Sequence, residues 1–386
     1  MDDYLETLNG FEKTLPSNWY LDSNIYALER EHIFMQEWLC VGREEQCPNP
    51  GDCKVLDIYG ESILLARNHE GVLRSFYNVC RHRGAQLCPS DSDLSDQNIV
   101  LKGGLIAGKA FVCPYHAWTY DLDGQLQGAP HINKDVGLDA EKVRLHPVGC
   151  ETWGGFVFLN LSPDTAPPFS SVIADIAERY QRYPLESLVI GKTIEYEVNA
   201  NWKVLCENYN ECYHCGPVHP ELCQIVPAFR ENGGANLDWE RGVPHREGAT
   251  TFTVSGTTHR KPFPGLNEDE INRHKGDLLY PNLFISLAAD HIVVFILKAI
   301  TADKTKIDCH FLFEEKEVKN PHFDPSDAVD FWHLVNRQDW AICERVQKGM
   351  ASRAHDFGIL SPMEDWNLDL RRYVKNRIGS YIESTQ

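Results

Sequence analysis

Two short segments, each pairing one cysteine with one histidine, constrain this chain more than any other feature of its sequence. The first is Cys80-Arg-His82 and the second is Cys113-Pro-Tyr-His116, and both lie in loop-like stretches with apolar flanks. Pro at position 114 fixes its own φ angle, and an Asp-Gly pair at 123–124 is a strong turn signal between strands. Two thiolates and two imidazoles together can ligate either zinc or a [2Fe–2S] cluster.

The mixed composition of each segment favours the cluster over zinc. A zinc site of two Cys and two His usually takes both cysteines from one knuckle and both histidines from the other. In a [2Fe–2S] cluster with two His ligands, each loop gives one Cys to the inner iron and one His to the outer. The two imidazoles raise the reduction potential, which makes the cluster a one-electron relay. Two alternatives remain: a structural zinc site, or four unrelated residues among the 13 Cys and 16 His.

A second group of candidate ligands lies in the segment 201–220. His214 and His219 are five residues apart, a rotation of about 500° on a helix, so they do not share one face of a straight helix. Gly216-Pro217 is expected to end a helix just after His214 and to let His219 return from a loop. Two imidazoles can then converge on one metal ion, and iron in oxygenases typically uses two His and one carboxylate.

Asp339 is the best candidate for that carboxylate. The pattern of apolar residues over 328–350 predicts a helix, and Asp339 falls on its apolar stripe. A buried carboxylate there is costly unless it is paired or binds a metal. The alternative for Asp339 is an exposed position or an ordinary ion pair, and Asp330, Glu344 and Asp356 are weaker candidates for the ligand.

Composition limits the classes of function. The formal charge of −19 argues against nucleic-acid binding, which needs a basic face. No stretch of 18 apolar residues predicts a membrane span, and the first residues lack the basic and apolar regions of a signal peptide. Thirteen cysteines, an odd number, suggest reduced thiols and metal ligands rather than a disulfide framework. We therefore expect a soluble cytoplasmic protein that binds neither nucleic acid nor membrane.

The strings CRHRG and FVCPYHAWTYDLDG resemble the Rieske domain of the Rieske non-haem iron oxygenases, in their oxygenase (α) component. The resemblance implies an α+β protein in three parts. An N-terminal helical arm (1–39) packs on the catalytic domain, an all-β Rieske [2Fe–2S] domain spans 40–162, and a helix-on-antiparallel-sheet (helix-grip-like) catalytic domain spans 163–386. The spacer 83–112 is longer than is usual in this family, with extra polar sequence at 91–98.

The resemblance also implies the cofactors and their ligands. The cluster ligands are Cys80, His82, Cys113 and His116, and the ligands of a mononuclear Fe(II) are His214, His219 and Asp339. Glu211, three residues before His214, is implied to carry electrons between the two sites by hydrogen-bonding His214 and His116 of a neighbouring subunit in a homotrimer. Electrons come from NAD(P)H through a separate flavin or iron–sulfur reductase, and O2 is the co-substrate.

The strings CENYNECYHC and YPNLFIS resemble the branch of the family that oxidises glycine betaine, carnitine, choline or proline betaine. A small quaternary-ammonium substrate that is hydroxylated or N-demethylated is therefore implied. Aromatic rings bind such cations by cation–π attraction. The candidate pocket residues are Tyr209, Trp239, Phe252, Tyr280, Phe284 and Phe295. Two alternative functions are an aromatic-ring-hydroxylating dioxygenase α subunit and a Rieske electron carrier without oxygenase activity.

Overall fold

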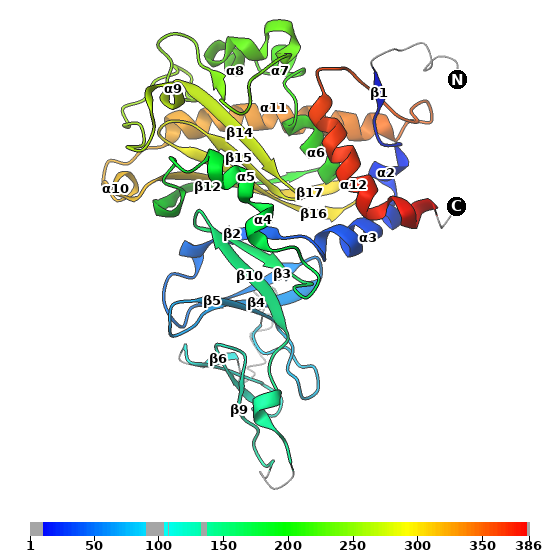
Figure 1. Cartoon of the computed structure of the whole chain (residues 1–386), viewed down its shortest axis with the longest axis vertical. Helices are drawn as coiled ribbons and strands as arrows, with labels where there is room; N and C mark the ends of the chain where they lie inside the picture. Colours follow the sequence, from blue (N-terminus) through cyan, green and yellow to red (C-terminus); the bar gives the residue numbers. More distant parts are fainter. Residues whose placement is uncertain (1–10, 90–103, 107, 133–136, 384–386) are drawn as a thin grey trace, which may run out of the picture. The chain divides into compact units, whose positions relative to one another are not determined.

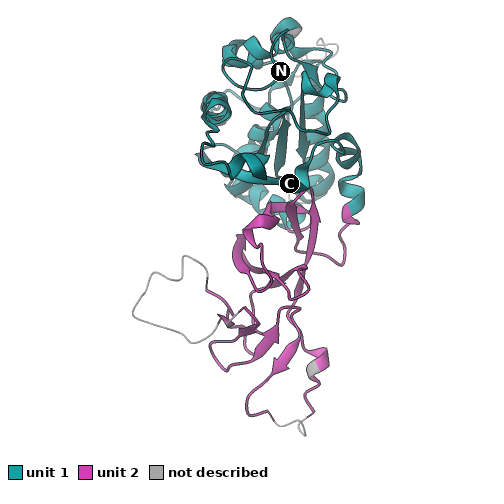
Figure 2. Cartoon of the chain, turned by 90° about the vertical axis from the view of Figure 1, so that its left-hand side faces the viewer, with its two compact units in different colours: residues 1–34, 170–386 teal, residues 35–169 magenta. Residues whose placement is uncertain are grey.

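The computed structural model of the chain describes residues 11–89, 104–106, 108–132 and 137–383. It divides into two compact units (Figure 2), a larger one of residues 1–34 and 170–386 and a smaller one of residues 35–169. The predicted domain limits were 40 and 162, so the division lies five residues earlier at one end and seven later at the other. The polar insertion predicted at 91–98 lies outside the described residues.

Aromatic packing explains why the smaller unit is longer at both ends than the sequence suggests. The ring of Trp38 lies 5.2 Å from that of Phe169, which in turn lies 4.8 Å from that of Phe158. The indole N–H of Trp38 donates to the carbonyl of Pro167 at 3.0 Å. The segment 163–169, whose Pro-rich composition predicts a connector, is thus part of the smaller unit, held there by burial of apolar rings.

The smaller unit consists of two antiparallel sheets (Figure 1). One sheet has the order β2-β11-β10-β5-β4-β3 and the other has the order β6-β7-β8-β9. The strands of the first sheet are β2 (Leu39–Arg43), β3 (Cys53–Ile58), β4 (Glu61–Arg67), β5 (Leu73–Tyr77), β10 (Pro147–Trp153) and β11 (Phe156–Asn160). The strands of the second are β6 (Gly104–Ile106), β7 (Ala110–Val112), β8 (Thr119–Asp121) and β9 (Leu126–Gly128).

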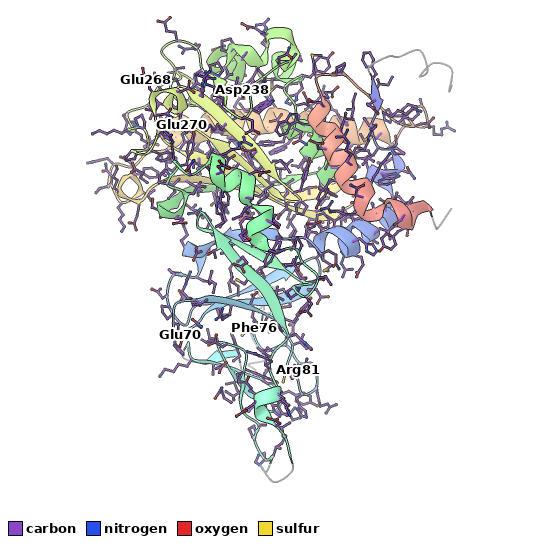
Figure 3. All side chains as sticks on the ribbon, viewed as in Figure 1. Glu70, Phe76, Arg81, Asp238, Glu268 and Glu270 are labelled. Carbon is purple, nitrogen blue, oxygen red and sulfur yellow. The ribbon has the colours of Figure 1, made fainter. Side chains whose placement is uncertain are left out.

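The turn between β8 and β9 requires the glycine of the Asp-Gly pair at 123–124. Gly124 has a φ of +79°, and its N–H donates to the carbonyl of Asp121 at 3.1 Å. A Cβ at this position would come within 2.5 Å of the ring of Phe76. Figure 3 labels Phe76 and also Arg81, a residue of the first cluster loop. Both the left-handed backbone and the close ring therefore require glycine at 124.

The larger unit contains a six-stranded antiparallel sheet with the order β12-β17-β16-β15-β14-β13. Its apolar run from 283 to 300 forms two paired strands, because the backbone turns at Asp290 and His291, where the N–H of Ala288 donates to the carbonyl of His291 at 3.1 Å. The strands are β12 (Leu188–Val198), β13 (Val243–Pro244), β14 (Arg273–Leu279), β15 (Leu283–Leu287), β16 (Ile292–Thr301) and β17 (Lys304–Glu314). A separate two-stranded pair joins β1 (Glu12–Lys13) and β18 (Ile359–Leu360).

Helices pack on this sheet, as the predicted α+β class requires. The long helix α11 (Ser326–Met350) contacts β12 through Asn336, whose amide donates to the hydroxyl of Tyr196 at 3.3 Å. The other α-helices are α2 (Asn18–Leu21), α3 (Ser23–Glu29), α4 (Phe169–Val172), α5 (Ala174–Arg179), α6 (Trp202–Tyr209), α7 (Cys215–Val218), α8 (Pro220–Ile225), α9 (Glu268–Ile271), α10 (Glu315–Val318) and α12 (Asp365–Glu383). None of the helices in the described ranges is long and apolar enough to span a membrane.

The N-terminal helices α2 and α3 belong to the larger unit. Glu29, at the end of α3, is fully buried and pairs with the equally buried ammonium of Lys203 on α6. The second carboxylate oxygen of Glu29 accepts the indole N–H of Trp202 at 2.9 Å. This buried ion pair anchors the arm to the helix that leads into the segment of His214.

Replacing Glu29 with Gln should destabilise the larger unit by ~3–5 kcal/mol, because it leaves the buried Lys203 ammonium without a counter-charge. The measurement is thermal and urea unfolding of the intact protein. The double variant Glu29→Gln/Lys203→Met should recover most of the lost stability, since it removes the unpaired charge. A Glu29→Gln protein that unfolds like the wild type would contradict this account of the arm.

Candidate metal centres and substrate cavity

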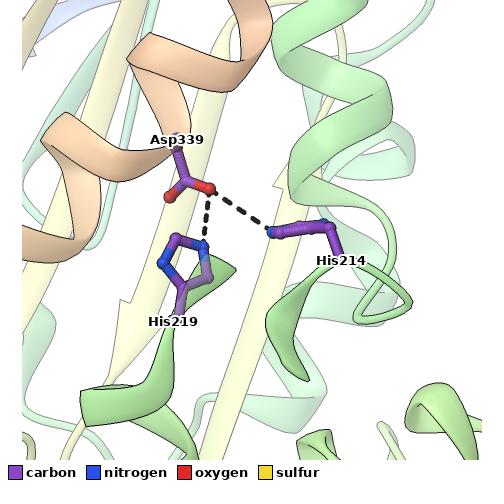
Figure 4. Close-up of side chains that lie close together, drawn as sticks. All are labelled: His214, His219 and Asp339. Carbon is purple, nitrogen blue, oxygen red and sulfur yellow. Dashed lines mark hydrogen bonds and ion pairs between the residues drawn. The ribbon is translucent and has the colours of Figure 1, made fainter. Parts of the chain in front are cut away.

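Two histidines and one carboxylate meet in the larger unit (Figure 4). Nε2 of His219 lies 2.8 Å from Oδ1 of Asp339, and Nε2 of His214 lies 3.3 Å from the same oxygen. His214 precedes α7, His219 joins α7 to α8, and Asp339 lies midway along α11. Among the residues that the structure describes, these are the only three whose ligand atoms all lie within 4.8 Å of one another.

The helices next to His214 and His219 begin and end at other residues than we predicted. We predicted a helix that continues through His214 and is ended by Gly216-Pro217. Instead α6 ends at Tyr209, and Pro217 lies in the four-residue helix α7. Proline is tolerated in the first turn of a helix because the N–H that it lacks has no partner there, so the Gly-Pro pair does not mark a helix end. His214 and His219 therefore flank α7, one on each side.

The outer nitrogens of both imidazoles are held by hydrogen bonds. Nδ1 of His214 lies 2.6 Å from a carboxylate oxygen of Glu211, and Nδ1 of His219 lies 2.8 Å from Oε1 of Gln338. The amide of Gln338 donates in turn to Glu221 at 3.1 Å, which fixes its oxygen towards His219. Each Nδ1 consequently carries a proton, and each Nε2 faces Asp339.

Charge and burial fit this site to a divalent metal. Burial lowers the pKa of His214, but its hydrogen bonds to Asp339, Cys215 and Glu211 prevail and raise that pKa well above its usual range. Burial raises the pKa of Asp339, yet hydrogen bonds from His214 and His219 hold it below its usual value. The carboxylate thus stays charged and needs positive charge beside it. The donor set of two His and one carboxylate is that of non-haem Fe(II) oxygenases.

The four predicted cluster ligands also come together, in the smaller unit. The rings of His82 and His116 lie 4.6 Å apart at 70°, and the buried thiols of Cys80 and Cys113 interact with each other. Tight turns shape both loops, because the N–H of Gly84 donates to the carbonyl of Cys80 at 3.0 Å and that of Ala117 to Cys113 at 2.9 Å. The hydroxyl of Tyr120 lies 3.4 Å from the sulfur of Cys80.

One observation fits this set to a metal centre. Nδ1 of His116 is buried and has no hydrogen-bond partner among the described residues, as expected for a nitrogen reserved for a metal. One Cys and one His from each loop is the donor set of a [2Fe–2S] cluster that has two His ligands.

A cavity of about 750 Å³, including its opening to solvent, adjoins His214, His219 and Asp339. Its wall combines aromatic rings with the carboxylates of Glu211, Asp277 and Asp339, and no Lys or Arg is among its described lining residues. Asp277 is held from behind by Arg179 at 2.6 Å and by the hydroxyl of Tyr180. A cavity of this composition suits a cation whose surface is apolar.

Three of the six predicted pocket aromatics line this cavity, namely Tyr209, Trp239 and Phe252. The structure does not bring the other three to it. Phe284 and Phe295 lie in the core, 1% and 3% exposed, with Phe284 stacked on Tyr209, and Tyr280 stacks on Tyr373. The alternation of residues along the strand predicts which face of the sheet carries Phe284. The sequence does not predict where that face lies relative to the cavity.

Other lining residues were not predicted at all: Phe229, His274, Trp332 and Trp366. Trp332, Val335 and Asp339 share one face of α11, so their helical spacing could have shown that Trp332 lies beside the metal ligand. His274 and Gly276 face the cavity from β14. The Gly, His and charged residues of region 230–278 predict a mobile loop region, and this prediction misses the alternation within β14.

Comparison with known proteins gives a consistent result. Residues 37–147 match the Rieske [2Fe-2S] domain family, and residues 185–380 match the family of the catalytic domain of ring-hydroxylating α subunits. The carnitine monooxygenase oxygenase subunit of Escherichia coli K12 is 37% identical, over 89% of this chain and 85% of that protein. The glycine betaine monooxygenase oxygenase subunit of Pseudomonas aeruginosa (strain UCBPP-PA14) is 27% identical, over 92% and 88%.

A solved structure shares the fold. It is that of a quaternary ammonium Rieske monooxygenase described for carnitine oxidation and inter-subunit electron transfer. It superposes with a TM-score of 0.71 at 24% identity, over 95% of this chain and 96% of that one. These matches confirm the expected fold class of a Rieske domain joined to a helix-and-sheet catalytic domain. They do not fit a zinc-binding module or an electron carrier that lacks a catalytic domain.

Replacing Asp339 with Ala should lower the mononuclear iron occupancy roughly tenfold or more while leaving the cluster spectrum unchanged, because only one of the two sites loses a ligand. Metal analysis and the EPR spectrum of the reduced protein measure the two sites separately. Glu344→Gln is the matched control on the same helix, since Glu344 binds the N–H of Asn199 instead. Iron retained in the Ala variant would show that Asp339 is not the ligand.

Proposed function

The chain belongs to the family of Rieske non-haem iron oxygenases, and we propose that it oxidises small quaternary-ammonium compounds. The observation that carries the proposal is the cavity beside His214, His219 and Asp339. A quaternary ammonium group carries positive charge but no hydrogen-bond donor, so it is recognised by aromatic faces and carboxylates. The lining provides both and provides no cationic side chain to repel the substrate.

The residues of the chain have separate tasks in this reaction. His214, His219 and Asp339 would hold the mononuclear iron, which when bound would supply reductive activation of O2. Glu211 and Gln338 orient the two imidazoles through their Nδ1 atoms. Tyr209, Trp239, Phe252 and Trp332 would exclude water and hold the cation with an N-methyl group towards the iron.

The overall chemistry balances as a monooxygenation. One N-methyl group, O2, two electrons and two protons give an N-hydroxymethyl group and water. The hydroxymethyl ammonium then releases formaldehyde and leaves the demethylated amine, with the proton of the hydroxyl group transferred to nitrogen. Substrates of the glycine betaine, carnitine, choline or proline betaine type all carry the required N-methyl group.

We also propose the partners that this chemistry needs. Electrons would come from NAD(P)H through a separate flavin or iron–sulfur reductase, and the chain would work as a homotrimer in the cytoplasm. None of the thirteen cysteines, all of which lie in the described ranges, forms a disulfide, which suits a reducing compartment. Within the trimer, Glu211 would accept a hydrogen bond from His116 of a neighbouring subunit while holding His214. In support, Tyr115 beside His116 is 58% exposed, so this cluster loop lies at the surface of its unit.

The substrate class can be tested without the reductase. Holoenzyme reduced with dithionite and mixed with O2 should release formaldehyde and a demethylated amine from at least one of carnitine, glycine betaine, choline and proline betaine. Mass spectrometry with 18O2 identifies the products. Benzoate and naphthalene are the comparison substrates, and a dihydrodiol from either would favour the ring-dioxygenase alternative. No product from any quaternary amine would reject the proposal.

The role of Glu211 can be separated from metal binding. Glu211→Gln should retain both iron sites but slow the oxidation of the reduced cluster by O2 and substrate by about 10- to 100-fold, the usual effect of losing such a partner. Stopped-flow absorbance of the cluster measures this rate. Glu221→Gln is the control, because Glu221 acts on His219 through Gln338. Oxidation of the cluster in the Glu211→Gln variant at the wild-type rate would exclude the bridging role.

A further inference from the structure

His274 presents a polar side chain to the cavity. It projects from β14, lines the cavity and is only 7% exposed. Its Nδ1 is buried, whereas its Nε2 lies on the side of Gly276 and the hydroxyl of Tyr209. Nε2 is therefore the atom that can form a hydrogen bond with a ligand in the cavity.

The ring of His274 is uncharged at physiological pH. Burial lowers its pKa to about 3, and the neighbouring His245 contributes to the lowering. A neutral imidazole offers one N–H donor and one lone-pair acceptor. His274 therefore adds no positive charge to the cavity and can form hydrogen bonds without repelling a cation.

Gly276, two residues further along β14, has no side chain to crowd this ring. A Cβ at 276 would lie 3.2 Å from Nε2 of His274 and 3.3 Å from the hydroxyl oxygen of Tyr209, and both are tight contacts. The backbone at 276 does not have the left-handed φ that requires glycine. Glycine is therefore explained by the two polar atoms that approach the narrow space beside its Cα.

The hydroxyl of Tyr209 is fixed in place on the other side of this space. It donates to the carbonyl of Ile285 and contacts the hydroxyl of Ser286, both at 2.9 Å. Ser286 also lines the cavity. The imidazole of His274 and the hydroxyls of Tyr209 and Ser286 thus give this part of the wall neutral hydrogen-bonding groups.

We propose that His274, Gly276 and Tyr209 form a subsite for the oxygen-bearing end of the substrate, a hydroxyl or a carboxylate. The inference rests on the proposed function. Because a quaternary ammonium group forms no conventional hydrogen bonds, the groups of this subsite must serve another part of the same molecule. The subsite then selects oxygenated quaternary amines over plain alkyltrimethylammonium cations of the same size.

Matched substrate pairs test the subsite. For the hydroxyl, choline is compared with propyltrimethylammonium. For the carboxylate, 4-trimethylammoniobutanoate is compared with (4-methylpentyl)trimethylammonium. In His274→Leu, kcat/KM for formaldehyde release should fall about 10- to 100-fold for the oxygenated member of one pair and change less than about twofold for its alkyl partner, with the affected pair identifying the oxygen group. His274→Gln, which keeps a donor and an acceptor, should recover part of the loss.

His245→Leu is the matched control. His245 is similarly buried at 9% exposure, and its ring packs against Phe252 as that of His274 does, at 5.2 and 4.7 Å. It does not belong to the described lining of the cavity. A purely structural role would make the two Leu variants alike. Gly276→Ala, which fills the space, should reproduce the selective loss with His274 intact.

The outcomes separate this inference from the proposed function. Equal losses for both members of each pair in His274→Leu, or no loss at all, would overturn the subsite while leaving the substrate class in place. Wild-type enzyme that turns over none of the four compounds, and none of carnitine, glycine betaine and proline betaine, would overturn both. Calorimetric dissociation constants for the same four compounds provide an independent readout, with the same selective loss expected in His274→Leu.

Discussion

A single carboxylate oxygen of Asp339 faces two imidazoles, and the larger unit is organised around this contact. A carboxylate on the apolar stripe of a 25-residue helix is costly to bury unless positive charge lies beside it. His214 and His219 meet that need only if the segment between α6 and α8 lies against α11. The same contact that stabilises the helix thus assembles the donor set for iron.

The hydrogen bonds behind the imidazoles decide what the site can bind. Glu211 holds one ring and Gln338, itself held by Glu221, holds the other. Both rings therefore present Nε2 to the same point before any metal arrives, which lowers the cost of organising the ligands. The cavity beside the imidazoles is also organised in advance. Asp277 is already fixed by Arg179 and Tyr180, so it need not rearrange for a cation.

The sequence could predict the chemistry of these sites better than the backbone that supports them. Ligand identity depends on residue type and spacing, so Cys80, His82, Cys113, His116, His214, His219 and Asp339 could all be named in advance, and the structure brings each set together. Helix α11 was predicted almost to its ends because its apolar spacing extends over many turns. Ligation itself remains a prediction, since it concerns metals rather than positions.

Predictions from local sequence were wrong where tertiary contacts determine the secondary structure or the position of a side chain. Gly216-Pro217 reads equally well as a helix end or as the first turn of a new helix. Residues 273–279 belong to the region 230–278, whose Gly, His and charge content predicts loop, yet their pairing with β15 makes them a strand. Which aromatics reach the cavity depends on the orientation of a whole sheet face, so Phe284 and Phe295 could not be told from Phe252.

The central claim is that one chain holds a two-iron cluster and a separate single iron. Analysis of iron, acid-labile sulfide and zinc in the purified holoprotein tests it most directly. The account predicts about three iron atoms and about two sulfides per chain, with zinc absent in stoichiometric amount. Zinc in place of iron, or iron without sulfide, would contradict it.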